Sequence, residues 1–213
     1  IIKSSNIGTA RIALDIGAER QRAFLGKLGM LEETGFEIVE AATGKPLLPK
    51  NWSELSTMTI SYGHGLSTSP MHLAAGYAAL ANGGFKVKPT ILKQDGPKLG
   101  ERVFSESSAK ASMKMLREVV TEGTASFGEV KGYAVGGKTG TADKPKRTGG
   151  YYDDKVIATF ASVFPARAAA RAYVPPEPMP ISPSSGSSTS PVPVSTSETP
   201  ASATAIIASR RLR

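Results

Sequence analysis

The chain has 213 residues, with 26 Lys or Arg, 18 Asp or Glu, two His and no Cys. The absence of Cys excludes disulfide frameworks, zinc ribbons and cysteine nucleophiles, and two scattered His argue against a metal site, so we expect neither a metal nor a cofactor. The net charge of +8 is spread along the chain without a dense basic run, which argues against a nucleic-acid partner.

The first half of the chain predicts helices joined by an irregular segment. Asn6 to about Gly29 predicts two helices that meet near Gly17. Residues 30–55 carry Gly and Pro with little periodicity, so we expect an extended surface segment that ends near Trp52. The residues expected to face the core from the two helices are Ile7, Ala10, Leu14, Phe24, Leu25 and Leu28.

Two later helices have clear ends in the sequence. Ser69 as N-cap and Pro70 at the first helical position open one helix, which Asn82-Gly83-Gly84 stops. Ser105 caps the other helix, which ends at Gly123. The predicted buried stripe of this second helix consists of Ala109, Met113, Leu116 and Val120.

Three segments predict strands, namely 85–92, 132–138 and 155–164. Pro89 places the first at a sheet edge or bulge. A charged, Gly-containing turn separates the other two, which suits an antiparallel hairpin. Helices followed by antiparallel strands indicate an α+β fold.

The composition changes abruptly at Pro165. Residues 166–213 contain eight of the 15 Pro, ten Ser and one Gly, and they show no period. Such a segment buries too little apolar surface to offset the ordering entropy, so we predict one domain over 1–165 and a disordered tail over 166–213. The tail is either a natural linker or the product of a shifted reading frame; the shift is favoured because the tail hardly uses the Lys, Gly, Asp and Glu of the body.

Two short motifs carry chemistry. Lys138-Thr139-Gly140-Thr141 ends a predicted strand, where an ammonium and hydroxyls at a sheet edge suit an extended anionic ligand. Ser4-Ser5-Asn6 places a hydroxyl and a carboxamide at a helix start, which suits proton relay and the binding of a peptide amide. Alone, each motif is an ordinary turn or N-cap.

Together and in this order, the motifs resemble the S-x-N and K-T-G signatures of the penicillin-recognising serine enzymes. The resemblance extends to the transpeptidase domain of class B penicillin-binding proteins, most closely the cell-division members, and covers about residues 1–165. The further segments that carry it are Trp52–Leu55, Thr59–Leu66, Thr68–Ala74, Ala81–Gly84 and Lys131–Tyr133.

The resemblance implies a serine β-lactamase-like fold and acyl transfer. In this family a Ser attacks the carbonyl between two terminal D-alanines of a peptidoglycan stem peptide, an amine resolves the acyl-enzyme into a crosslink, and β-lactams mimic the dipeptide. The implied partners are stem peptides, β-lactams and division proteins. The parent protein would carry an N-terminal anchor in the inner membrane, with this domain on the periplasmic side.

The resemblance also implies a role for each motif residue. Ser4 would shuttle protons, Asn6 would hold the substrate, and Lys138 would set the electrostatic field around the hydroxyls. We therefore expect Lys138, Ser4 and Asn6 to converge on a single cleft. The hydroxyls of Thr139 and Thr141 would bind the ligand carboxylate, and the backbone N–H of Thr141 would form half of the oxyanion hole. Gly140 would let the substrate backbone approach the strand.

The S-x-x-K motif that bears the nucleophile should precede S-x-N, yet only three residues precede Ser4. The match Ser107-Ser108-Ala109-Lys110 lies between the other two motifs, so we expect it to be accidental. A final strand and a C-terminal helix are also expected after Phe164 and are not evident in the tail. We therefore expect an incomplete sheet and a fragment that is inactive alone.

Two alternatives stay open: a non-catalytic module that binds stem peptides or partner proteins, and a β-lactamase relative, against which the segment 52–84 argues. The DNA upstream of Ile1 separates the first from the enzyme, because an in-frame S-x-x-K supports the enzyme and a start codon beside Ile1 supports the module. His64 and His72 are interpreted as solvated or packing residues rather than general bases.

Overall fold

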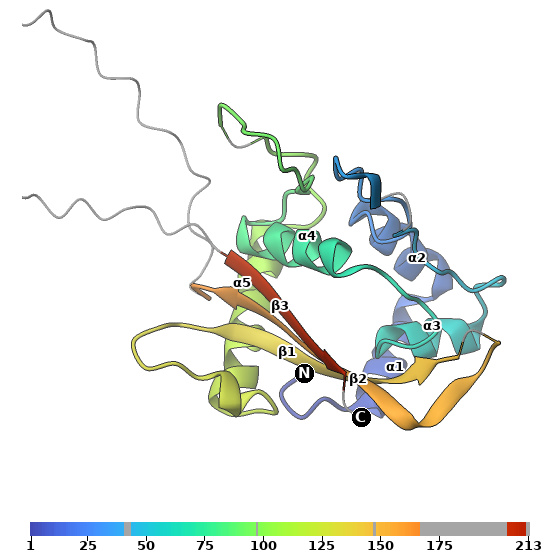
Figure 1. Cartoon of the computed structure of the whole chain (residues 1–213). Coiled ribbons are helices and arrows are strands. Elements are labelled where there is room, and N and C mark those ends of the chain that lie inside the picture. The colour runs from blue at the N-terminus through green and yellow to red at the C-terminus, as the bar shows by residue number, and fades with distance from the viewer. Residues whose placement is uncertain (41–43, 97, 147, 167–203, 212–213) are drawn as a thin grey trace, which may run out of the picture.

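The computed structural model describes residues 1–40, 44–96, 98–146, 148–166 and 204–211 (Figure 1). In Figure 1 three strands run side by side, with α4 and α5 against the sheet and α1, α2 and α3 grouped beside it. The architecture is α+β, as the order of helices and strands predicted. The elements are α1 (Asn6–Ile16), α2 (Ala18–Lys27), α3 (Glu54–Ser61), α4 (Pro70–Ala81), α5 (Glu106–Thr121), the 3-10 turn η2 (Ser126–Gly128), β1 (Gly136–Pro145), β2 (Tyr151–Phe164) and β3 (Thr204–Arg211).

The predicted break between the first two helices is confirmed at Gly17, whose φ of 84° ends α1 and starts α2. The predicted core face of α1 is wrong, because Ile7 is 74% exposed while Ala13 is only 3% exposed. Leu14 and Phe24 are exposed as well. The helix packs against α3 through a narrow face on which the small Ala13 is buried, so its large apolar residues lie outside that contact.

Helix α3 was not predicted from the sequence. Its eight residues make little more than two turns and follow an irregular stretch rich in Gly and Pro, so they give no clear period. Ser53 caps the helix by accepting a hydrogen bond from the Ser56 N–H at 3.1 Å. Gln21 of α2 donates to the Thr57 carbonyl at 2.9 Å and so ties α2 to α3.

The other two helices follow the prediction closely. Ser69 is the N-cap of α4, Pro70 is its first residue and Asn82 ends it. Ser105 caps α5 and accepts from the Ser108 N–H. All four residues of the predicted stripe of α5 are buried, together with Val119.

The antiparallel hairpin is confirmed, but its first strand begins at Gly136 instead of Gly132 and continues to Pro145. Gly132 adopts a φ of 88° in a turn closed by a Val130–Tyr133 bridge, which a strand cannot accommodate. Lys138 therefore lies within β1 rather than at the end of a strand. Since the sheet order is β1-β2-β3, β1 is an edge strand among the described strands.

The strand predicted at 85–92 is wrong. Only an isolated bridge between Phe85 and Arg102 forms there. The short apolar run from Phe85 is interrupted at Pro89, which lacks the N–H that a ladder requires.

The expectation that no strand follows Phe164 is corrected by β3, which pairs antiparallel with β2 from Phe164↔Thr204 to Ile157↔Arg211. Composition averaged over the whole tail concealed this short β-branched run. Ala166, which was assigned to the tail, is 9% exposed and belongs to the core. Residues 167–203 and 212–213 lie outside the described residues, so disorder and a shifted frame there stay predictions.

The main core lies between the sheet and the helices α4 and α5. One cluster joins Met113 and Leu116 of α5 to Ala81, Val163 and Ala166. A second joins Val119, Val120 and Ala125 to Phe160 of β2. These contacts fix the C-terminal end of α5 against the hairpin that carries the K-T-G sequence.

Candidate active site

The N-terminal motif divides its two serines between two tasks. Ser5 is the N-cap of α1, since its Oγ accepts from the Gly8 N–H at 3.1 Å. Ser4 stands one residue earlier with a φ of 52°, and it is the one non-glycine residue in the described part of the chain with a left-handed backbone. That conformation costs roughly 1–2 kcal/mol. Because Ser5 makes the cap, the Ser4 hydroxyl is available for other contacts.

Lys138 contacts the Ser4 hydroxyl. Its Nζ donates to Ser4 Oγ at 2.8 Å and to the Thr139 carbonyl at 2.9 Å. Strand β1 and the start of α1, which are far apart in the sequence, therefore meet at one point, as the two motifs predicted. The ammonium occupies an acceptor position of the Ser4 oxygen, so the hydroxyl proton of Ser4 is free to be donated elsewhere.

The environment of Lys138 favours an anionic ligand. The side chain is half-buried, and burial lowers the pKa of its ammonium from the ordinary value. No carboxylate forms an ion pair with Lys138 within the described residues. The charge is thus partly desolvated and uncompensated, which strengthens its interaction with an arriving carboxylate.

The remaining predicted site residues lie beside this contact. Thr141 is exposed on the edge strand, and the Thr139 hydroxyl lies 3.0 Å from that of Thr124. Gly140 has a structural reason to be glycine, because a Cβ there would lie 2.7 Å from Thr159 Oγ1 on β2. Thr124 was not predicted, since a Thr after a helix-ending Gly gives no signal of its own.

Asn6 is only partly placed by the structure. It is the first residue of α1, two positions from Ser4, and its side chain is exposed. Across the described residues, no hydrogen bond joins the Asn6 side chain to Lys138 or to the threonines of β1. Its assignment to the substrate side therefore stays a prediction.

The accidental S-x-x-K match has other partners. Ser107 Oγ lies 2.8 Å from Ser105 Oγ at the cap of α5. Lys110 pairs with Glu106 at 2.7 Å on the same exposed turn. Both side chains therefore take part in the local structure of the helix start.

The two histidines differ in their surroundings. His72 is 2% exposed; its Nε2 donates to the Glu32 carbonyl at 2.7 Å, and its Nδ1 accepts from the Ser69 hydroxyl at 2.7 Å. It joins the start of α4 to the segment that follows α2. His64 packs between Tyr62 and Tyr151, with ring centroids 5.6 and 6.4 Å away. Both rings therefore pack against neighbouring segments.

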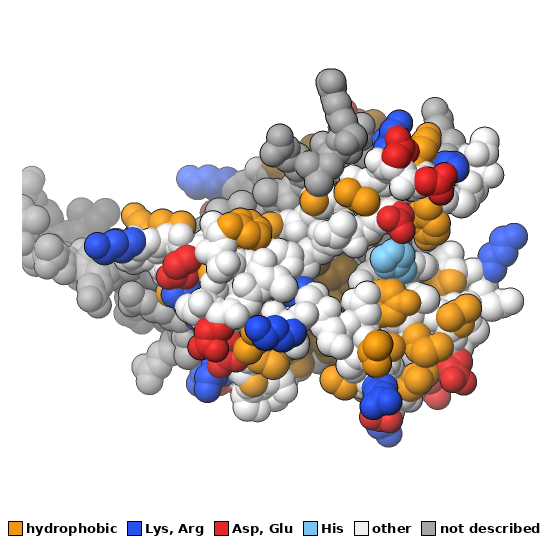
Figure 2. Space-filling view, turned by 90° about the horizontal axis from the view of Figure 1, so that it is seen from below, with side chains coloured by type: hydrophobic (Ala, Val, Ile, Leu, Met, Phe, Trp, Pro, Cys, Tyr) orange, Lys and Arg blue, Asp and Glu red, His pale blue; other side chains and the backbone are white. Residues whose placement is uncertain are grey.

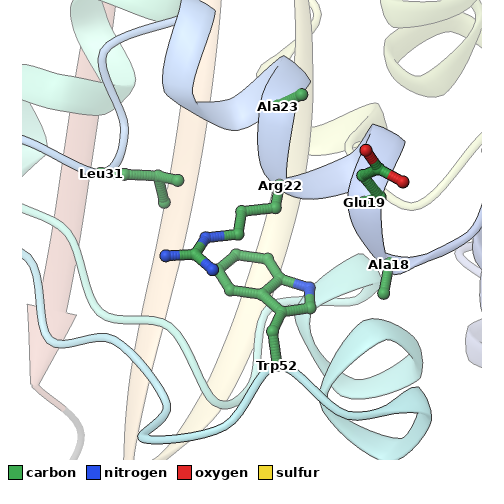
Figure 3. Close-up of a pocket in the computed structure, with 6 residues that line it drawn as sticks. All are labelled: Ala18, Glu19, Arg22, Ala23, Leu31 and Trp52. Atoms are coloured by element: carbon green, nitrogen blue, oxygen red, sulfur yellow. The ribbon is translucent and has the colours of Figure 1, made fainter.

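A separate open cavity lies beside α2 (Figure 3). The Arg22 guanidinium lies 5.8 Å from the centroid of the Trp52 ring, and the indole N–H donates to Gln21 at 3.1 Å. Trp52 thus lies at the rim of this cavity. The lining residues are Ala18, Glu19, Arg22, Ala23, Leu31 and Trp52, none of which belongs to the two motifs.

Two further observations concern metals and membranes. The described residues contain no cluster of three or more His, Asp or Glu side chains suited to a metal ion. Among the described helices, none has both the length and the apolar character needed to cross a membrane.

An α+β domain whose edge strand directs a half-buried Lys onto a serine beside a helix start has the arrangement expected of the penicillin-recognising serine enzymes. A profile of the penicillin binding protein transpeptidase domain matches residues 1–174. The chain belongs to this family of penicillin-binding protein transpeptidase domains.

Curated relatives agree with the family. The chain is 34% identical over 165 residues to the peptidoglycan D,D-transpeptidase FtsI of Escherichia coli K12, covering 77% of the chain and 28% of the relative. It is 36% identical over 184 residues to the penicillin-binding protein PbpB of Mycolicibacterium smegmatis, covering 77% and 28%. The chain thus spans less than a third of the length of these relatives.

Solved structures show the same fold. The transpeptidase domain of penicillin-binding protein 3 from Burkholderia pseudomallei matches with a TM-score of 0.72 at 38% identity, covering 79% of this chain and 52% of that one. Penicillin-binding protein 3 from Mycobacterium tuberculosis, solved in complex with aztreonam, matches with a TM-score of 0.70 at 32% identity, covering 78% and 41%.

Proposed function

We propose that this chain forms part of a peptidoglycan D,D-transpeptidase that crosslinks stem peptides during septal wall synthesis. The observation that carries the proposal is the 2.8 Å hydrogen bond from Lys138 Nζ to Ser4 Oγ, which joins the K-T-G strand to the S-x-N turn. The names of the relatives, which include peptidoglycan D,D-transpeptidases, support the same reaction class.

The proposed roles follow from the geometry and chemistry of the site. A serine nucleophile, supplied by an S-x-x-K segment that is not among the 213 residues, attacks the carbonyl between the two D-alanines. As the bond to the carbonyl carbon forms, the hydroxyl proton of the nucleophile passes to the lysine of the S-x-x-K segment. The tetrahedral oxyanion then collapses with cleavage of the C–N bond, the departing D-alanine amine takes the free proton of the Ser4 hydroxyl, and the lysine of the S-x-x-K segment returns a proton to Ser4. Lys138 stays protonated and holds the field positive throughout.

The binding roles are assigned to the edge strand and the start of α1. The hydroxyls of Thr139 and Thr141 bind the terminal carboxylate of the D-alanyl ligand, and the backbone N–H of Thr141 donates to the oxyanion. Asn6 holds the amide of the substrate. A β-lactam takes the place of the D-alanyl dipeptide, in keeping with the relative solved with aztreonam.

The wider setting is part of the proposal. We expect the complete protein to work with other proteins of the division apparatus. We also expect it to hold this domain on the periplasmic side of the inner membrane by an N-terminal helix.

Labelling with fluorescent penicillin tests the proposal. The 213-residue chain alone is expected to stay unlabelled, and a product extended upstream through an in-frame S-x-x-K is expected to be labelled. In the extended product, Lys138→Ala or Ser4→Ala should slow labelling by about 100-fold or more, the size typical of lost acid–base groups. Ser107→Ala and Lys110→Ala are the matched controls and should label normally.

Two results would contradict the proposal. If the 213-residue chain is labelled by itself and the label is lost in Ser107→Ala, then Ser107 is the nucleophile. A start codon beside Ile1, with no labelling of the product, would instead favour the non-catalytic binding module.

A further inference from the structure

The turn after α5 contacts both halves of the site. Thr124 lies between α5 and η2, and its Oγ1 is 3.0 Å from Thr139 Oγ1 on the K-T-G strand. Its neighbour Gly123 is packed so closely against the N-terminal segment that a Cβ there would lie 2.8 Å from the Ile2 carbonyl oxygen. Two residues of one turn therefore touch the strand of Lys138 and the segment that leads to Ser4.

This turn is held firmly in place. Ala125 is fully buried against Val119 and Val120, and its N–H donates to the Val119 carbonyl at 3.1 Å. A Cβ on Gly123 would also lie 2.8 Å from the Val119 carbonyl oxygen. Because the residues on both sides of Thr124 are fixed, the exposed Thr124 hydroxyl has a defined position over the strand.

The direction of the hydrogen bond follows from the ligand. A threonine hydroxyl has one proton, and a carboxylate only accepts hydrogen bonds. When Thr139 donates its proton to a carboxylate, the bond to Thr124 must run from Thr124 to Thr139. The two hydroxyls then form a chain that ends on the anion, and each bond strengthens the next.

We propose that Thr124 is a positioning residue that orients the Thr139 hydroxyl toward the carboxylate of the bound ligand. This inference rests on the proposed function, since it assigns the carboxylate of a D-alanyl or β-lactam ligand to Thr139. Without the Thr124 hydroxyl, the Thr139 hydroxyl rotates freely and loses the partner that keeps its proton on the ligand side.

The test compares a ligand with and without its carboxylate. Dissociation constants of benzylpenicillin and of its methyl ester are measured by NMR titration of the 213-residue chain, in which no acylation is expected. Wild type should bind the acid more tightly than the ester. Thr124→Val should raise the dissociation constant of the acid by about threefold to tenfold, the effect of one hydrogen bond, and leave the dissociation constant of the ester unchanged.

Three further variants isolate the hydroxyl from the fold. Thr124→Ser keeps the donor and should bind the acid within about twofold of wild type, well inside the effect of one hydrogen bond. Thr121→Val removes an exposed hydroxyl that donates to the Arg117 carbonyl at 3.3 Å on the same helix, and it should change the dissociation constant of neither ligand. In a Thr139→Val background, Thr124→Val should have no additional effect.

The outcomes separate this inference from the proposed function. Equal weakening of acid and ester by Thr124→Val, or no weakening of the acid, overturns the positioning role while the site stands. If wild type binds acid and ester with equal dissociation constants, and if Lys138→Ala binds the acid as tightly as wild type does, the proposed function is overturned and this inference with it.

Discussion

At the scale of single residues, the site depends on a lysine that is partly removed from water. Among the described residues, Lys138 interacts with a hydroxyl and a carbonyl rather than with a carboxylate, so these dipoles stabilise its charge. Burial lowers the pKa of this ammonium. The partly desolvated charge therefore acts more strongly on the Ser4 hydroxyl than a fully solvated ammonium would.

This lowered pKa predicts a pH dependence of stability. Between the pKa of folded Lys138 and the ordinary lysine pKa of 10.5, the unfolded chain binds more protons than the folded chain. The free energy of unfolding therefore increases as pH rises through that window. Lys138→Met should lack this increase. Urea unfolding of both proteins from pH 7 to 11 measures it, and parallel pH profiles would contradict the burial of the charge.

Tyr77 predicts the opposite trend at higher pH. Burial raises its pKa to about 12 from 10.0, so the folded state binds more protons between these values and loses stability as pH rises. Phe does not titrate, so the stability of Tyr77→Phe relative to wild type should be greater at pH 11 than at pH 8. Thermal unfolding at pH 8 and pH 11 checks this, with an unchanged difference as the contrary result.

The sequence indicated which residues meet, but not how. Lys138 and Ser4 were predicted to converge because of motif order and resemblance. The transfer of the capping role to Ser5, which frees Ser4, depends on backbone geometry that the sequence does not show. Thr124 was missed for the same reason, because its role arises only from the packing of α5 on the hairpin.

At the scale of elements, helices with strong caps were predictable and weakly patterned ones were not. The caps Ser69 and Ser105 and the stripe of α5 were sufficient to define two helices. Helix α3 was too short to show a period, and β3 was concealed by the composition around it. The start of β1 was misplaced because the backbone at Gly132 is left-handed.

The turn after α5 is packed too closely to accept a larger residue at Gly123. Gly123→Ala should destabilise the chain by about 1–3 kcal/mol, the usual cost of overpacking, because the new Cβ meets the carbonyls of Ile2 and Val119. Gly96→Ala is the matched control, since a Cβ there has no atom within 4 Å. Chemical unfolding measures both, and equal stability of the two variants would contradict the close packing of the turn.

At the scale of the whole molecule, the described surface retains large apolar side chains. Figure 2 shows hydrophobic side chains on the face seen from below. On α1 the exposed apolar residues are Ile7 (74%), Ile12 (61%), Leu14 (37%) and Ile16 (46%). The chain covers 52% of the Burkholderia pseudomallei domain, so that domain has further residues that this chain does not match.

The pairing of β3 with β2 predicts a role for the last residues in stability. Removal of residues 204–213 would leave the second edge of β2 unpaired along eight register positions. An open edge lowers stability and favours association between chains. The shortened chain should therefore melt at a lower temperature and elute earlier in size-exclusion chromatography, whereas identical behaviour would show that β3 does not contribute.

Lys138 and Ser4 form one unit in this site, and a double-mutant cycle on the 213-residue chain measures whether their side chains are coupled. The free energies of unfolding of wild type, Ser4→Ala, Lys138→Met and the double variant give the coupling between the two side chains. The 2.8 Å hydrogen bond predicts a coupling of about 0.5–1.5 kcal/mol. Strictly additive effects, with no coupling, would place the two residues in separate environments and contradict the shared site.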